Sequence, residues 1–271
     1  MKNSSKNKSP NNLQYYSPMI KRIETPYMDS KYFGFLDGNL YLENTQKTFV
    51  PSRIVDALAN FWCLAYALDL PQGLLSLFRH GQPLPVIGNM GLFIPPFSIL
   101  DWRLNIGQFE WKSVLMFSEP PETAPKFATL FPLNYELPFT KSGINSEIFD
   151  QIKKSGQRVD KEEKLIPLSL KVKRAIDLNF NSSISIGDIA KNINSTASPI
   201  SRAFKITYDI SPLFYRNQLR VFDASLKLLK GETVTEAAHE VGFQDLSRFN
   251  KQFKEKMRAI PSQFKSVVPT K

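Results

Sequence analysis

Two stretches near the carboxy-terminal end of the chain carry basic and small polar side chains at helical spacing. The first set is Ser198, Ser201, Arg202 and Lys205, and the second set is Ser247, Arg248, Asn250, Lys251 and Lys254. Residues three and four apart lie on the same side of a helix. Guanidinium, ammonium, hydroxyl and amide groups are the donors that reach phosphate oxygens and base edges in DNA. The two sets therefore predict two helix faces that contact DNA.

A weaker interpretation applies to each residue taken singly. About half to two-thirds of protein–DNA hydrogen bonds go to phosphate and sugar, so Ser201, Arg202, Asn250 or Lys251 could touch phosphate alone. The weakest interpretation of the whole segment is a small helical bundle whose basic residues are only a solvated face. Such a bundle has no reason to repeat, and this segment does repeat.

The segment from Ile184 to Lys265 contains an internal repeat of two copies. The matching positions are Ile189-Ala190 with Ala237-Ala238, Ile193 with Val241, Arg202 with Lys251, Phe204-Lys205 with Phe253-Lys254, Pro212 with Pro261, and Tyr215-Arg216 with Phe264-Lys265. The offset between the copies is 48 residues before the turn and 49 after it. One residue has therefore been added in the turn of the second copy.

Each copy has the pattern of a short helix, a tight turn and a second helix. A small alanine in the first helix allows two helices to cross closely, and Asn194 or Gly242 suits the left-handed conformation that ends it. Ser198 or Asp245 is expected to cap the second helix. The pattern predicts two helix-turn-helix motifs, a type of motif that places its second helix in the major groove of DNA.

A rigid spacer is expected between the two motifs, which span about residues 186–208 and 234–257. Residues 212–229 form a helix candidate with Ser211 as its cap and Gly231 as its end. One apolar stripe runs along it through Tyr215, Leu219, Phe222, Leu226 and Leu229. At 1.5 Å per residue the helix is roughly 27 Å long, comparable with the ~34 Å between successive major-groove faces.

The segment from Leu168 to Lys265 resembles the double helix-turn-helix domain of the AraC/XylS family of bacterial transcription regulators. The resemblance rests on the runs SRAFK, ISPLFYRNQLR, EVGFQDLSRFNKQF and PSQFK at the family's spacing. Asp209 and Arg258 stand where the family usually has glycine, and Ile260 replaces its usual serine cap. Arg258 suits the left-handed conformation poorly, so we expect the last short helix to dock less firmly.

The resemblance implies a sequence-specific regulator that binds double-stranded DNA and is not an enzyme. In that family activation usually comes from contact with RNA polymerase beside the promoter, so an activator is expected. The resemblance also implies an amino-terminal domain that senses a small molecule or forms a homodimer. It implies no cofactor.

The distribution of charge agrees with a DNA-binding carboxy-terminal domain. Residues 161–271 hold 19 lysines and arginines against 11 aspartates and glutamates, a net charge of +8, while residues 1–160 carry a net charge of +2. Release of counter-ions from DNA favours a basic partner and makes its binding weaken steeply with salt. Charge alone would also fit an anionic membrane surface, and the repeat decides for DNA.

The composition also indicates a cytoplasmic protein. Residues 1–12 are polar and basic, without the apolar run of a secretory signal, and are expected to form a disordered tail. Cys63 is the single cysteine and lies among apolar neighbours, so a buried thiol in a reducing compartment is expected. The longest apolar run, residues 61–70, is too short to span a bilayer and predicts a buried strand or short helix.

Residues 13–160 are expected to form a β-rich regulatory domain, so the predicted fold is an α+β two-domain protein. Aromatic and β-branched residues alternate with turn formers, and Asp37-Gly38-Asn39 predicts a hairpin. Ten of the 19 prolines fall between Pro71 and Pro138, which favours a barrel or sandwich of short strands. An amphipathic helix is expected near residues 146–156, capped by Ser146. A flexible linker is expected over residues 157–164.

The run GLFIPPFSILDWRL resembles the strand-turn-strand of cupin-like sensory domains. The two histidines, His80 and His239, lie in different domains, so no histidine cluster is expected and no metal site is predicted. An apolar lining could enclose a small molecule, with Arg79, Trp102 and Arg103 as candidate effector-binding residues. A plain hydrophobic core is the alternative. The expected lining is Phe33, Phe35, Phe61, Trp62, Phe93, Trp102, Phe109 and Trp111.

A rival interpretation is a cupin-like enzyme or small-molecule carrier whose carboxy-terminal helices serve only association. It needs a metal constellation or an acid–base set in the β-rich domain. The acidic residues there have no spacing that ties them together, and histidine is nearly absent. The sequence therefore favours the DNA-binding regulator.

Overall fold

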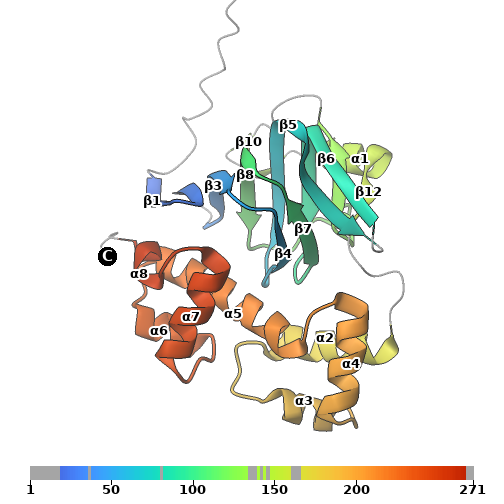
Figure 1. Ribbon diagram of the computed structural model, residues 1–271, viewed down its shortest axis with the longest axis vertical. Helices are drawn as coiled ribbons and strands as arrows, with labels where there is room; N and C mark the ends of the chain where they lie inside the picture. Colours follow the sequence, from blue (N-terminus) through green and yellow to red (C-terminus); the bar gives the residue numbers. More distant parts are fainter. Residues whose placement is uncertain are drawn as a thin grey trace, which may run out of the picture.

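The chain folds into an antiparallel β-sheet domain and a helical domain that lies below it in Figure 1. The computed structural model describes residues 19–35, 38–79, 82–133, 139–140, 143–144, 147–159 and 166–266. The expected amino-terminal tail, His80 and the Ser146 cap lie outside these residues. This arrangement is the expected α+β fold with two domains.

One sheet of ten strands makes up most of the amino-terminal domain. Its main path runs β1-β2-β3-β8-β5-β6-β9-β12, and β4 joins it through β7, which pairs with β5. The strands of the chain are β1 (Met19–Thr25), β2 (Met28–Gly34), β3 (Leu40–Thr48), β4 (Ser52–Ala57), β5 (Trp62–Arg79), β6 (Gln82–Ile94), β7 (Ile99–Leu104), β8 (Gly107–Met116), β9 (Thr129–Pro132) and β12 (Gln157–Arg158), with a separate pair β10 (Phe139–Thr140) and β11 (Gly143–Ile144). The expected hairpin between β2 and β3 is present, with Gly38 at φ +85°.

The strands are not uniformly short, which corrects the sequence-based expectation. β5 is 18 residues long and β6 is 13. The pairing of β5 with β6 shifts register around Leu70, next to Asp69 and Gly73, which both have positive φ. Such bulges bend a strand and increase its twist, so β5 pairs with β8 at its start and with β7 near its end. Turn-forming residues thus lie inside a strand instead of ending it.

The aromatic residues of the sheet domain pack into two separate clusters, so the single lining expected from the sequence is wrong. Trp62 and Phe93 pack with Phe149 on one side of the sheet. Phe61 and Trp102 belong to the other cluster, which continues into the helical domain. Alternation along the strands explains the split, because neighbouring residues point to opposite faces.

Helix α1 (Glu147–Ser155) packs its apolar face on its own sheet domain. Ile148, Phe149 and Ile152 are buried, as the amphipathic pattern predicts. The chain then pairs as β12 with β9, so residues 157 and 158 belong to the sheet and not to the expected linker. Hydrogen bonding to β9 orders these two residues despite their polar sequence.

The helical domain contains α2 (Pro167–Asn179), α3 (Ile186–Asn192), α4 (Ala197–Tyr208), α5 (Pro212–Leu229), α6 (Val234–Glu240), α7 (Leu246–Met257) and α8 (Pro261–Phe264). The central helix α5 separates α3 and α4 from α6 and α7 (Figure 1). Ser211 caps α5 by accepting a hydrogen bond from the Phe214 N–H, and Gly231 follows the helix at φ +100°. None of the described helices is long and apolar enough to cross a membrane.

The interface between the domains is packed. The rings of Phe61 and Phe222 lie 5.1 Å apart, so α5 meets the sheet through an aromatic contact. Ala57 and Ile99 of the sheet domain join the core cluster of α2, α3 and α4. Helix α5 also contacts β4 directly. The sheet domain therefore touches both halves of the helical domain.

Candidate DNA interface

Helix α4 is the second helix of the first helix-turn-helix, and its two faces differ sharply. Ile200, Phe204 and Tyr208 are buried in the core. On the other side Arg202 and Lys205 are exposed. Ser198 is exposed as well, while Ser201 is half-buried. The first predicted set therefore lies on one helix with its charged members in solvent.

Helix α7 repeats this arrangement in the second motif. Phe249 and Phe253 are fully buried, and their rings are 5.5 Å apart. Every member of the second predicted set is exposed, namely Ser247, Arg248, Asn250, Lys251 and Lys254. Two solvated basic helix faces, one in each motif, are what contact with an extended polyanion requires.

The turns of the two motifs have the conformation that their sequences predict. Asn194 has φ +55° and Gly242 has φ +88°. Asp245 caps α7 by accepting hydrogen bonds from the N–H groups of Ser247 and Arg248. The corresponding prediction for Ser198 is wrong: α4 begins at Ala197, so Ser198 lies inside the first turn of the helix.

The first helix of each motif begins with a capping box that the sequence analysis missed. The Ser185 hydroxyl accepts from the Asp188 N–H, and the Asp188 carboxylate accepts from the Ser185 N–H. Thr233 and Glu236 make the same reciprocal bonds before α6. The spacing of a hydroxyl residue and an acid three positions later was the signal that could have found them.

A polar face of α5 joins the two motifs, and sequence reasoning missed it. Arg220 is buried and donates to three backbone carbonyls, at 2.5 Å to Phe180, 2.7 Å to Ser182 and 2.9 Å to Gly242. Phe180 and Ser182 precede the first motif, while Gly242 is the turn of the second. One guanidinium therefore fixes the second motif against the segment that leads into the first.

Positive charge accumulates beside this joint. Burial and the nearby charges of Arg216 and Arg248 lower the pKa of Arg220 to about 10. Burial and Arg248 also lower the pKa of Arg216. These three arginines lie close enough to repel one another, so positive charge is concentrated where the second recognition helix begins.

The last short helix is firmly packed, contrary to the expectation from Arg258. Phe264 is fully buried and its ring lies 5.1 Å from that of Phe253. The Ile260 N–H, which lacks a serine cap, donates to the Gln263 side chain at 2.9 Å. The buried Phe264 ring holds α8 in place, even though α7 ends at Arg258 and not at glycine.

Of the three candidate effector residues, the structure describes the side chains of Trp102 and Arg103. Trp102 is half-buried in the cluster that faces the helical domain. Arg103 donates to Asp101 at 2.6 Å and lies over the Phe78 ring at 4.2 Å. The side chain of Arg79 lies outside the described residues. Among the side chains that the structure describes, no cluster of metal-ligating residues is found.

Known proteins resemble both the carboxy-terminal part and the whole fold. Residues 189–266 match a family model described as a helix-turn-helix domain. Over 91 residues the chain is 29% identical to the lactose operon transcription activator of Staphylococcus xylosus, covering 33% of each protein. Over 98 residues it is 30% identical to the Msm operon regulatory protein of Streptococcus mutans, covering 36% of this chain and 35% of that protein. The chain thus matches about a third of the length of these relatives.

The fold resembles that of ToxT from Vibrio cholerae. The structure of ToxT with an unsaturated fatty acid bound aligns with 84% of this chain and 96% of that chain, at a TM-score of 0.54 and 12% identity. A second crystal form of ToxT gives a TM-score of 0.51 over 83% of this chain and 97% of that one. At this level of identity the likeness shows a shared fold of a sheet domain followed by a helix-turn-helix domain.

These findings define a helix-turn-helix domain in the carboxy-terminal part of the chain. This part, with two motifs on one central helix, matches the helix-turn-helix family model over residues 189–266, and the chain is similar to the two operon regulators over 91 and 98 residues.

Proposed function

We propose that this protein is a sequence-specific transcription regulator that activates its targets. The single observation that carries the proposal is the pair of exposed basic faces on α4 and α7, each in a complete helix-turn-helix unit. The operon regulators matched by the helical domain, one of them a transcription activator, support this function. The protein is then a cytoplasmic DNA-binding protein whose partners are double-stranded DNA and RNA polymerase.

The predicted contact residues are assigned as follows. Residues on α4 and α7 enter two successive turns of the major groove, with α5 as the spacer. The DNA-contacting set is Ser198, Ser201, Arg202, Lys205, Ser247, Arg248, Asn250, Lys251 and Lys254. Arg202 and Lys251 occupy matching positions of the two copies and are both exposed, and we assign these two side chains to base edges.

A selection of duplexes from a random library tests the proposal. The full chain should enrich one sequence and bind it far more tightly than random DNA at moderate salt. Arg202→Ala and Lys251→Ala should each weaken binding to the selected duplex by about 1 to 3 kcal/mol. Lys153→Ala, which removes an exposed charge from α1, is the control.

Two outcomes contradict parts of this proposal. Equal losses on selected and random DNA would assign Arg202 and Lys251 to phosphates instead of bases. Failure of the wild-type chain to enrich any sequence would remove the proposed function itself.

The sheet domain is proposed to sense a small molecule or to form a homodimer. ToxT, which shares the fold, has been crystallised with an unsaturated fatty acid, which supports an apolar ligand with an acidic group. Arg79, Trp102 and Arg103 are the proposed contacts. Since Arg103 already donates to Asp101, an acidic ligand has to compete with that carboxylate. The apolar face of α1 is buried on its own sheet, so a dimer would use another surface or the polar side of α1.

A further inference from the structure

Both recognition helices end on a residue in the left-handed conformation that carries a side chain. Asp209 follows α4 with φ +59°, and Arg258 follows α7 with φ +55°. Glycine is the residue that adopts this conformation without steric cost and is the commonest choice at this position. Because glycine is absent at both equivalent positions, we expect the side chains of Asp209 and Arg258 to have a role besides ending the helices.

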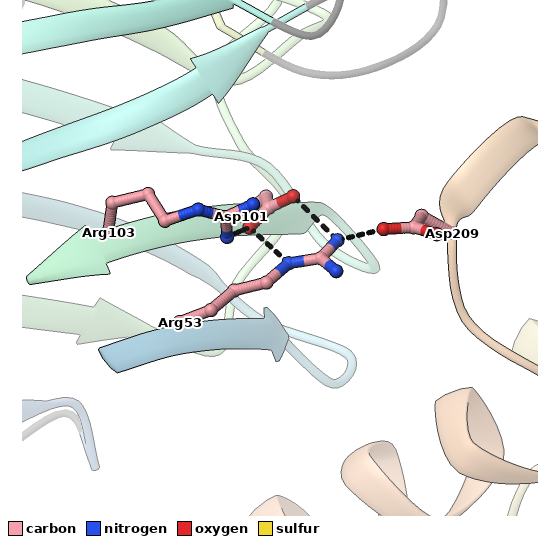
Figure 2. Close-up of polar contacts among 4 residues, drawn as sticks. All are labelled: Arg53, Asp101, Arg103 and Asp209. Carbon is pink, nitrogen blue, oxygen red and sulfur yellow. Dashed lines mark hydrogen bonds and ion pairs between the residues drawn. The ribbon is translucent and has the colours of Figure 1, made fainter. Parts of the chain in front are cut away.

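The side chain of Asp209 forms an ion pair with the sheet domain. Its carboxylate accepts a hydrogen bond from Arg53 of β4 (Figure 2). Arg53 is itself held by Asp101 of β7 through two parallel hydrogen bonds of 3.0 and 2.9 Å. Asp101 is only 2% exposed and also accepts from Arg103. This carboxylate therefore orients Arg53 toward the end of α4.

Hydrogen bonding to Asp101, joined by that to Asp209, raises the pKa of Arg53. A bidentate pair between a guanidinium and a carboxylate fixes geometry as well as charge. Arg53 is thus an oriented donor and not a flexible surface charge. Asp209 pairs with a guanidinium that Asp101 already holds in place.

The end of α7 meets the same domain. Arg258 lies over the Tyr27 ring at 5.7 Å, in the turn between β1 and β2. Two residues earlier, Lys256 forms an ion pair of 2.5 Å with Asp56. The Lys256 side chain is only 5% exposed, because its stem is covered where α7 approaches the sheet. The carboxy-terminal ends of α4 and α7 therefore both contact the sheet domain.

Both ion pairs involve residues of a single strand. Arg53 and Asp56 both belong to β4, and α5 packs against that strand between the two motifs. The sign of charge is opposite at the two points, since β4 offers a cation to α4 and an anion to α7. β4 is in turn hydrogen-bonded along its length to β7. The two motifs are consequently joined by the sheet as well as by α5.

We propose that strand β4 positions the two recognition helices relative to each other and thereby sets the operator spacing that the protein accepts. Asp209 and Lys256, which pair with β4, are positioning residues, and Arg258 adds a contact with the turn between β1 and β2. The inference rests on the proposed function. Occlusion of DNA is the alternative role for such a contact, but the basic faces of α4 and α7 stay exposed while their ends are attached. Attachment to the sheet domain therefore leaves both basic faces accessible to DNA.

The test uses the full chain and the duplex obtained by selection, with the segment between the two contacted base sets lengthened or shortened by one or two base pairs. One base pair rotates the second base set by roughly a tenth of a turn. The wild-type chain should lose at least about tenfold in affinity for the altered spacings. The triple variant Asp209→Gly, Lys256→Met and Arg258→Gly, which removes both ion pairs with β4 and the contact with Tyr27, should lose about threefold or less, because its motifs can adjust.

Asp69→Gly is the matched control, because it makes the same change at another left-handed aspartate, within β5. Its spacing preference should equal that of the wild-type chain. Circular dichroism checks that each variant is folded. The exchange Arg53→Asp with Asp209→Arg should restore part of the preference that Arg53→Asp alone removes.

An unchanged spacing preference in the triple variant would overturn the inference while leaving the proposed function intact. An equal gain in affinity at every spacing would also overturn it, in favour of occlusion. If the wild-type chain selected no duplex at all, the proposed function would fail first and this inference with it.

Discussion

Gly242 holds the turn of the second motif at the point where Arg220 joins the two halves of the domain. A Cβ atom at this position would lie 2.6 Å from the backbone oxygen of Asn181 and 2.7 Å from the Arg220 guanidinium. Neither group can move freely, because one is backbone and the other donates to three carbonyls. Gly242→Ala is therefore a sensitive probe of the joint.

The cost of Gly242→Ala has two parts. A side chain at φ +88° costs about 1–2 kcal/mol in the left-handed region. Displacing Arg220 leaves at least one buried carbonyl without its charged donor, which costs about 1.5–3 kcal/mol. The sum is about 2.5–5 kcal/mol, a large fraction of the roughly 5–15 kcal/mol that stabilises a typical domain.

Asn194→Ala is the control, because Asn194 occupies the equivalent turn of the first motif with φ +55°. It is exposed, so the substitution should cost only the backbone preference, about 1 kcal/mol. The free energy of unfolding is measured by urea titration, with helical ellipticity as the signal. We expect the free energy of unfolding of Gly242→Ala to lie about 1.5–4 kcal/mol below that of Asn194→Ala. If the two variants unfolded within 1 kcal/mol of each other, the joint would not depend on Arg220 as argued.

Two further predictions concern groups that titrate. Burial raises the pKa of Asp177 above 3.8. The protonated form is thus favoured in the folded state, and this group adds stability as the pH falls from above its folded pKa toward 3.8. Asp177→Asn removes that increment, so urea titrations across this range should show the wild-type chain gaining on the variant, and a constant difference would contradict the argument. Burial raises the pKa of the Cys63 thiol to about 12, so a thiol reagent at pH 8 should modify it only at the rate of unfolding; immediate reaction would show that the thiol is accessible.

Features that depend on residues close together in the chain could be predicted from the amino-acid sequence alone. The left-handed turns at Asn194 and Gly242, the Asp245 cap and the helix from Pro212 to Leu229 all follow from residues within a few positions of each other. Backbone conformation and the hydrogen bonds of a helix end are local, so a pattern of side chains can specify them. The repeat then indicated two equal units without any knowledge of how they pack.

Contacts between residues far apart in the chain could be seen only in the folded structure. Residue types alone made Arg103 an effector candidate, but folding placed Asp101 beside it. The sequence showed Asp209 as a departure from glycine, and only the packing of two domains showed that its partner is Arg53, 156 residues away. The burial of Arg220 against three carbonyls is another contact that could not be predicted from the sequence. Such contacts are set by the distance between surfaces, and that distance is fixed only when both domains have packed together.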